Sequence, residues 1–338
     1  MSLSFIAAAD VSALDPLRVL GGAQVGTVGR DAAVAWPVQS VATPVLKQGT
    51  GVVVTGAAWH EAWLSDGPVV AGESEGIHWR RTADGLLYGV LELAERGGDG
   101  AAGSSALRRI SEKAYERIFH LLDAQALPHL WRVWNYIPDI NGEQAGLERY
   151  RQFNLGRGDA FERCARSVTE QVPAACALGS AGGPLSIAFM AGATPVLPIE
   201  NPRQVSAYRY PDVYGPRSPT FSRGALAHLP GLTLFFISGT ASIVGHETRH
   251  QGDVVAQLRE SLNNVEVVLE EANRQSPGGA FDLSSLVYRV YVRDAADAPA
   301  VMAALRERLG AVEALCVQAD VCRADLLVEV EAHGWRSA

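Results

Sequence analysis

Residues 105–136 read SALRRISEKAYERIFHLLDAQALPHLWRVWNY, and this stretch predicts the unit from which the fold is built. Its first part, residues 105–126, carries apolar residues at intervals of three and four, which predicts an amphipathic helix. The apolar positions of that helix are Leu107, Ile110, Ala114, Ile118, Leu121 and Leu122. Its last part, residues 129–136, alternates in hydrophobicity as a half-buried strand does.

The second half of the chain repeats this order. Residues 232–237 (LTLFFI) predict a short strand that ends at Ser238-Gly239, and Asp253 is a good N-cap for a helix over residues 254–274. The other predicted elements are strands at 51–57, 286–292, 314–318 and 326–330, a helix at 298–309, a partly helical stretch at 146–168 and an exposed loop at 97–104.

The recurrence predicts an internal duplication of architecture. Strand, long helix, strand and helix follow one another twice. Each copy is expected to form a mixed β-sheet with helices packed on one face, so the fold class is α+β. We place an N-terminal unit at residues 1–168 and a C-terminal unit at residues 169–338.

The charge and composition of the chain argue against several classes of protein. With a formal net charge of −8 and a pI of about 5.5, the surface repels nucleic acid and anionic lipid. No apolar run reaches the ~20 residues that a membrane helix needs, and residues 1–10 lack the basic start of a signal peptide. The four cysteines form neither a C-x-x-C pair nor a zinc-type cluster with histidine, so we expect reduced thiols in a cytoplasmic protein.

Two segments gather arginine in this acidic chain. Residues 149–166 hold five arginines against two acidic residues, and residues 201–224 hold four against one. An arginine binds a carboxylate through two parallel hydrogen bonds, and tyrosines in the second segment add hydroxyl donors and ring faces. Both segments are therefore candidate anion sites. The alternative is a solvated face with surface ion pairs, which contribute little.

Residues 237–253 (ISGTASIVGHETRHQGD) follow a predicted strand with small hydroxyl residues. Gly239 leaves room there for a ligand ring to approach the backbone, unless the segment is an ordinary turn. His246 and His250 have a spacing that resembles a metal site, but glycines flank them and no helical periodicity supports them. We therefore predict no metal site.

An acidic residue interrupts the last predicted strand. Glu329 lies between Val328 and Val330, where a carboxylate is costly unless it is paired or protonated. Burial would raise its pKa and turn the neutral carboxyl group into a proton donor. The alternative is an outward-facing carboxylate, since Glu329 and Glu331 share one strand face. The chain has no P-loop motif.

The C-terminal third resembles the RidA/YjgF family. The resemblance is carried by residues 237–240 (ISGT), 252–254 (GDV), 256–257 (AQ), 261–265 (SLNNV), 316–318 (CVQ) and 327–331 (LVEVE). It implies two RidA/YjgF-like (chorismate mutase-like) sheets and a site-facing position for Glu329. Ala314 stands where RidA proteins have an arginine, which argues against imine hydrolysis.

Over its whole length the chain resembles the chorismatase family more closely. The matching motifs are residues 135–141 (NYIPDIN) and 148–161 (ERYRQFNLGRGDAF), the Tyr/Arg loop at 208–223, and Glu329. The resemblance implies an enzyme without a cofactor that releases pyruvate from chorismate, with Glu329 as the general acid beside Gly239 and Cys322. The substrate-binding residues that it implies are Tyr150, Arg157, Tyr208, Tyr214, Arg217, Arg223 and Thr240.

Members of the chorismatase family differ in their products. Attack by water gives pyruvate and 3,4-dihydroxycyclohexa-1,5-diene carboxylate, whereas participation of the substrate's C4 oxygen gives pyruvate and 3-hydroxybenzoate. Gly239 and Cys322 resemble the pattern of the type that forms 3-hydroxybenzoate, which we therefore expect. The hydrolytic type and a non-enzymatic, RidA-like small-molecule binder are the alternatives. RidA proteins are trimers, but two such units in one chain favour a monomer, with a trimer as the alternative.

Overall fold

The computed structural model describes residues 2–26, 34–48, 58–95, 105–276 and 279–337, whose strands form two large sheets and smaller ones. The first large sheet has the order β12-β9-β13-β8-β7-β6, with β6 at Val70–Ser74, β7 at Ile77–Arg81, β8 at Leu86–Leu93, β9 at His129–Pro138, β12 at Ala174–Ser180 and β13 at Leu185–Gly192. The second has the order β14-β15-β16-β21-β19-β20-β4, with β4 at Val45–Gln48, β14 at Leu197–Ile199, β15 at Gly224–Leu229, β16 at Leu232–Ala241, β19 at Val287–Val292, β20 at Glu313–Gln318 and β21 at Val328–Ser337.

The remaining elements cover or join these sheets. A four-stranded sheet has the order β1-β5-β2-β3, with β1 at Leu3–Ala8, β2 at Val19–Val25, β3 at Val38–Val41 and β5 at Trp59–Ser65. Two small hairpins pair β10 (Glu143–Gln144) with β11 (Leu147–Glu148) and β17 (Ile243–Val244) with β18 (Glu247–Thr248). The helices are α1 (Ala106–Ala124), α2 (Arg149–Arg163), α3 (Val254–Gln275) and α4 (Ala298–Leu309), with short 3-10 turns at Ala207–Arg209, Asp212–Tyr214, Leu283–Ser285 and Ala295–Asp297.

The two large sheets repeat one topology. In the first, β8 leads through α1, β9, α2 and β12 to β13; in the second, β16 leads through α3, β19, α4 and β20 to β21. β12 is parallel to β9 as β20 is parallel to β19, and β13 and β21 each run antiparallel between two neighbours. The predicted α+β class, with duplicated mixed sheets, is confirmed.

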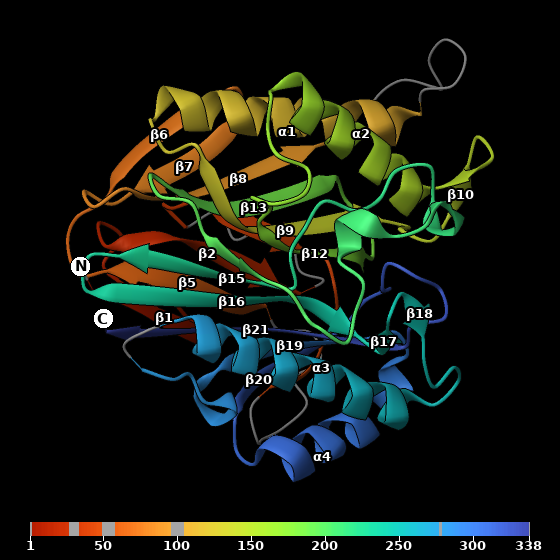
Figure 1. Cartoon of the computed structure of the whole chain (residues 1–338). Coiled ribbons are helices and arrows are strands. Elements are labelled where there is room, and N and C mark those ends of the chain that lie inside the picture. Colours follow the sequence, from red (N-terminus) through yellow and green to blue (C-terminus); the bar gives the residue numbers. More distant parts are fainter. Residues whose placement is uncertain (1, 27–33, 49–57, 96–104, 277–278, 338) are drawn as a thin grey trace.

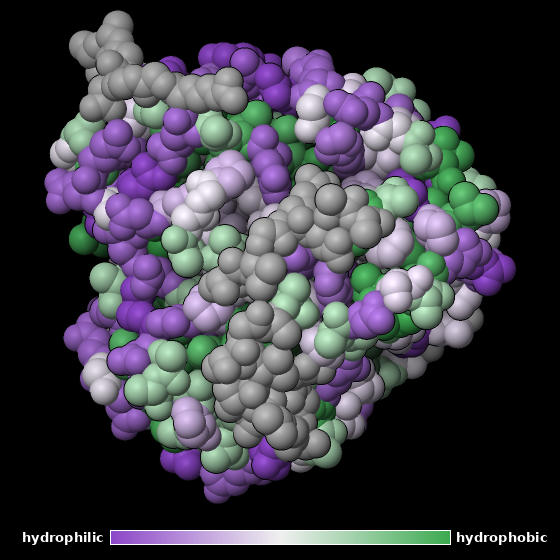
Figure 2. Space-filling model, turned by 180° about the vertical axis from the view of Figure 1, so that it is seen from behind, coloured by the Kyte–Doolittle hydropathy of each residue, from purple (hydrophilic) through white to green (hydrophobic). Residues whose placement is uncertain are grey.

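Both long helices begin where the sequence predicts because a side chain caps each one. Ser105 accepts a hydrogen bond from the backbone N–H of Arg108 at α1, and Asp253 accepts one from that of Ala256 at α3. Their apolar faces pack on the outer faces of the sheets, which leaves the inner faces opposite one another (Figure 1). Hydrophilic residues predominate along the helical layer at the top of Figure 2, and hydrophobic residues occur there in small groups.

One hydrophobic core lies between the inner faces of the sheets. The rings of Trp134 on β9 and Phe236 on β16 meet edge to face, with centroids 6.4 Å apart. Trp63 on β5 also packs against Phe236, so the four-stranded sheet closes one side of this core. The sequence analysis did not predict that third sheet.

β16 differs from its prediction. It does not end at Ser238-Gly239 but continues to Ala241, with a β-bulge between Ile237 and Thr240. The buried hydroxyl of Ser238 donates to the Ser222 carbonyl at 2.6 Å and accepts the N–H of Ala175 on β12 at 2.9 Å. The bulge therefore joins the two large sheets at the end where a cavity opens.

The remaining expectations have different outcomes. The partly helical stretch predicted at 146–168 is confirmed, with its helix over Arg149–Arg163, whereas the strand at 51–57 and the loop at 97–104 lie outside the described residues. The boundary after residue 168 does not coincide with the change of sheet, because β12 and β13 still belong to the first sheet and β4 belongs to the second. We propose two units that meet between β13 and β14. None of the helices in the described ranges is long and apolar enough to cross a membrane.

Candidate active site

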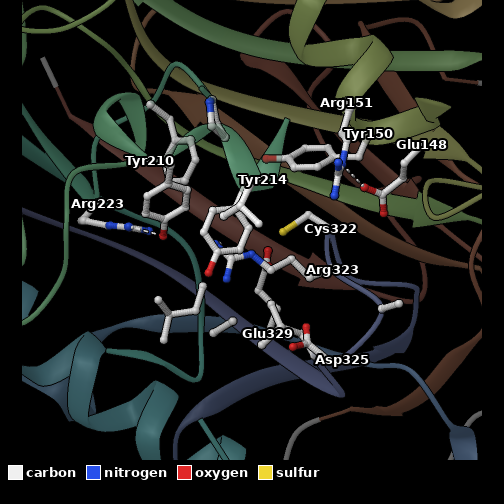
Figure 3. Close-up of a pocket in the computed structure, with 18 residues that line it drawn as sticks. Glu148, Tyr150, Arg151, Tyr210, Tyr214, Arg223, Cys322, Arg323, Asp325 and Glu329 are labelled. Carbon is white, nitrogen blue, oxygen red and sulfur yellow. Dashed lines mark hydrogen bonds and ion pairs between the residues drawn. The ribbon is translucent and has the colours of Figure 1, made fainter. Parts of the chain in front are cut away.

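A cavity of about 450 Å³ opens between the two halves of the protein. Its walls come from segments far apart in the sequence: the start of α2, the 3-10 turns of the Tyr/Arg loop, the end of β16, the loop before β21, and β21 itself. In Figure 3, Arg223 and Tyr210 lie at one side of the view and Arg151 with Glu148 at the other, with Tyr214 and Cys322 between them. Six of the predicted site residues line the cavity, namely Tyr150, Tyr214, Arg223, Gly239, Cys322 and Glu329.

Glu329 lines this cavity as a buried carboxyl group. It lies on β21 opposite Tyr291 of β19 and Ala241 of β16, and it is only 4% exposed. Burial, reinforced by the negative charge of Glu331, raises the pKa of Glu329 to about 8, although Arg132 and Arg223 oppose the shift. The alternative of an outward-facing carboxylate is therefore wrong, because the carboxyl group is buried against the cavity and its raised pKa favours the protonated form at neutral pH.

Small neutral groups surround the Glu329 carboxyl. Gly239 lies so close that a Cβ atom at this position would be 2.0 Å from Glu329 Oε1 and 3.2 Å from the Cβ of Cys176. Cys322 lines the cavity beside it, and burial raises the pKa of that thiol to about 12, so the sulfur stays protonated. The glycine in the bulge of β16 thus provides the space that the acid occupies.

Two guanidinium groups, those of Arg223 and Arg323, face the cavity and form no direct ion pair within the described part of the chain, although the charge of Arg223 also reaches the Glu200 carboxyl. Arg223 donates to the Tyr210 hydroxyl at 2.7 Å and to the Val205 carbonyl at 2.9 Å, and its Nε is buried without a partner. Arg323 donates to the His246 carbonyl at 2.9 Å, and its Nη2 is likewise buried and unpartnered within the described ranges. Such groups can bind the carboxylates of a ligand.

Aromatic rings hold these guanidinium groups. Arg323 lies over the ring of Tyr214, 3.8 Å from its centroid, and 5.1 Å from that of Tyr210. The hydroxyl of Tyr214 is 3.1 Å from Nδ1 of His246. Across the cavity, burial raises the pKa of Tyr150 above its ordinary value, which keeps its phenol neutral. The wall therefore presents rings and hydroxyl donors to a small ligand.

Four predicted substrate-binding residues do not line the cavity. Arg217 pairs with Glu162 at 2.7 Å, and Tyr208 lies under the guanidinium of Arg209. Thr240 is buried and donates to the Ser238 carbonyl at 2.7 Å. Arg157 is buried in α2, where it donates to Asn154 at 2.8 Å. For these four the geometry gives no ligand contact.

Most arginines of the two arginine-rich segments form ion pairs within the protein. Arg149 pairs with Glu95, Arg163 with Glu112 and Glu116, Arg166 with Asp123, and Arg203 with Glu260. Of the arginines in the two segments, Arg223 lines the cavity without such an ion pair, and Arg151 lines it but pairs with Glu148. The interpretation of both segments as anion sites stays a prediction.

Arg323 and Tyr210 are among the cavity-wall residues that the sequence does not single out. Arg323 follows Cys322 directly, and Tyr210 lies within the Tyr/Arg loop. The sequence gives no local signal for Arg323, because Asp325 lies only two residues after it and could equally have been its partner. Among the described residues, no group of His, Cys, Asp and Glu side chains is arranged to hold a metal ion.

Comparison with known proteins gives consistent matches. A family model described as chorismatase FkbO/Hyg5-like, N-terminal, matches residues 61–191. A chorismatase of Streptomyces rapamycinicus is 40% identical over 280 residues, which cover 80% of each chain. A 3-hydroxybenzoate synthase of Streptomyces hygroscopicus is 38% identical over 292 residues, which cover 83% of this chain and 82% of the relative. A crystal structure of a chorismatase matches with a TM-score of 0.86 and 31% identity over 98% of both chains.

Replacing Glu329 by glutamine should stabilise the fold increasingly as the pH rises. The folded protein holds the Glu329 proton up to about pH 8, whereas the unfolded chain loses it above the ordinary pKa of 4.5. Between these pH values the free energy of unfolding of the wild type falls by about 1.4 kcal/mol per pH unit, because unfolding releases the Glu329 proton. Glutamine does not ionise, so this decrease is absent from the variant. Urea unfolding at several pH values should show a difference between variant and wild type that grows up to about pH 8 and then levels off. A difference that is constant with pH would contradict the assignment of a protonated Glu329.

Proposed function

The chain belongs to the chorismatase family, and on this basis we propose that it converts chorismate to 3-hydroxybenzoate and pyruvate. The observation that carries the proposal is the carboxyl group of Glu329, which is 4% exposed and faces a cavity that also holds Arg223 and Arg323. Chorismate is a small dianion whose enol ether breaks only after a proton is added to carbon. A neutral acid between guanidinium groups suits that substrate.

The reaction begins with a proton transfer to carbon. Glu329 gives its proton to the methylene carbon of the enolpyruvyl group, whose double-bond electrons form the new C–H bond. Positive charge then develops on the carbon that carries the ether oxygen. The carboxylate that remains on Glu329 stabilises this charge at close range in a cavity of low polarity.

Loss of pyruvate follows without added water. The C4 oxygen of the substrate attacks C3, the bond between C3 and the ether oxygen breaks, and the side chain leaves as pyruvate. The proton of the C4 hydroxyl returns to Glu329. Ring opening of the resulting epoxide and loss of a ring proton then give 3-hydroxybenzoate. The relative named 3-hydroxybenzoate synthase and the presence of Gly239 and Cys322 beside the acid support this course over hydrolysis.

Purified wild-type protein incubated with chorismate should release pyruvate and an aromatic acid in equal amounts. The rate should fall as the pH rises through about 8, because Glu329 then loses its proton. Glu329→Gln should lower kcat by about 10²–10⁴-fold, the usual contribution of a general acid. A coupled lactate dehydrogenase assay measures pyruvate, and liquid chromatography identifies the ring product.

The other outcomes separate the alternatives. A diene diol in place of 3-hydroxybenzoate would favour the hydrolytic chorismatase. Chorismate binding without pyruvate release would favour the non-enzymatic binder. Pyruvate release that survives Glu329→Gln would assign the proton transfer to a different acid.

Arg323→Gln should raise the KM for chorismate by about tenfold or more, because a charge-assisted hydrogen bond to a carboxylate contributes about 1.5–3 kcal/mol. Arg217→Gln is the matched control, since Arg217 pairs with Glu162 and does not line the cavity. Its KM should stay close to the wild-type value. Equal KM changes in both variants would show that net charge, not contact, is responsible.

Gly239→Ala and Cys322→Ala should shift the product ratio toward the diene diol. Alanine at 239 places a Cβ 2.0 Å from Glu329 Oε1, so the carboxyl must move, and the rate should fall as well. Cys322→Ala removes a sulfur from the cavity wall and leaves space in which a water molecule can reach the cation. Chromatography of both ring products gives the ratio. An unchanged ratio in both variants would refute the role of these residues in product choice.

A further inference from the structure

We propose that Glu331 is a positioning residue that keeps the neighbouring Glu329 carboxyl protonated through its charge, without contact with the substrate. The inference rests on the proposed function, in which Glu329 is the proton donor. Glu331 does not line the cavity, and no step described above uses it.

The two carboxyl groups lie on the same face of one strand. Glu329 and Glu331 are two residues apart on β21, so their Cα atoms are about 7 Å apart. Across the ladder to β19, Glu329 is opposite Tyr291 and Glu331 is opposite Arg289. Both glutamates are about 95% buried between the sheets, at 4% and 5% exposed. One of them therefore faces an aromatic neighbour and the other a cation.

A buried network holds Glu331 as a carboxylate. Arg132 of β9 reaches it from the opposite sheet, and Arg289 Nη1 lies 3.3 Å from its Oε1. The hydroxyl of Tyr291 donates to the same oxygen at 3.0 Å. The network continues through Arg289 to Glu61 of β5, so two arginines balance two carboxylates. Removing the negative charge of Glu331 would leave that balance positive.

Glu329 has no such partner in the described part of the chain. From β16 it faces the bulge at Gly239, and from the loop before β21 it faces Cys322. Its charge also reaches the phenol of Tyr150 on α2 and the thiol of Cys176 on β12, and that thiol hydrogen-bonds Glu331. The charges that reach it are those of Glu331, which favours its protonated form, and of Arg132 and Arg223, which favour its ionised form. The guanidinium groups thus leave Glu331 ionised and the proton on Glu329, which divides the roles of two nearby carboxyl groups.

The test compares Glu331→Gln with Glu61→Gln, which makes the same chemical change one ion pair further from Glu329. In the pH dependence of kcat, the basic limb is the fall in kcat as the pH rises. This limb should move to a lower pH by about one unit or more in Glu331→Gln, because a nearby like charge typically shifts a pKa by that much. The shift should be smaller in Glu61→Gln. At a pH below the limb, Glu331→Gln should recover most of the wild-type kcat.

A second readout is independent of activity. A protonated carboxyl group gives a characteristic infrared band, and the band that is absent from Glu329→Gln belongs to Glu329. The pH at which half of this band is lost should be lower in Glu331→Gln than in the wild type. If the wild type releases no pyruvate, the proposed function fails, but this titration still tests the inference. A uniform loss of activity with an unmoved limb and an unmoved band would overturn it, because a merely structural role predicts that result.

Arg132→Gln provides a test with the opposite sign. Removing this cation should move the limb and the band to higher pH, because Arg132 favours the ionised form of Glu329. This variant also serves if Glu331→Gln does not fold. A downward shift or no shift in Arg132→Gln would count against the proposal.

Discussion

The site depends on the burial of one carboxyl group without a cation beside it. Moving a carboxylate from water into a protein interior costs several kcal/mol, so the group stays protonated unless a counter-charge compensates. Around Glu329 the fold provides Gly239 and the neutral thiol of Cys322, while Glu331, two residues along the same strand, takes the guanidinium groups of Arg132 and Arg289. The carboxyl group next to the cavity is therefore the one that keeps its proton.

The sequence predicts those parts of the fold that local patterns specify. The capped helices α1 and α3 and the strands β9 and β19 follow from hydrophobic period and from Ser105 and Asp253. The bulge of β16 was read as a strand end, because Ser238-Gly239 has the composition of a turn while its bonds to Ser222 and Ala175 are long-range. Such contacts leave no periodic signal in the chain.

At the site, too, contacts between residues far apart in the sequence could not be predicted, as the arginines show. Arg217, Arg223 and Arg323 are alike in the sequence, and only their neighbours in space distinguish them. Arg217 meets Glu162 and is neutralised, whereas Arg223 and Arg323 meet tyrosine rings and backbone carbonyls. Glu329 was identifiable because an acid in an apolar strand is costly whatever its partners are. A residue that conflicts with its local surroundings can be recognised from sequence, and one that depends on distant partners cannot.

The pairing of β4 with β20 has a consequence for synthesis of the protein. Strand β4 (Val45–Gln48) pairs with residues 315–317, and Glu61 pairs with Arg289, so the N-terminal segments find their partners only late in translation. Until β19, β20 and β21 have been synthesised, the inner face of the first sheet can meet only the part of the second sheet that β14, β15 and β16 form. The apolar surface of the early strands therefore stays exposed until the later strands have been synthesised. During that time, chaperone binding or association with another nascent chain competes with folding.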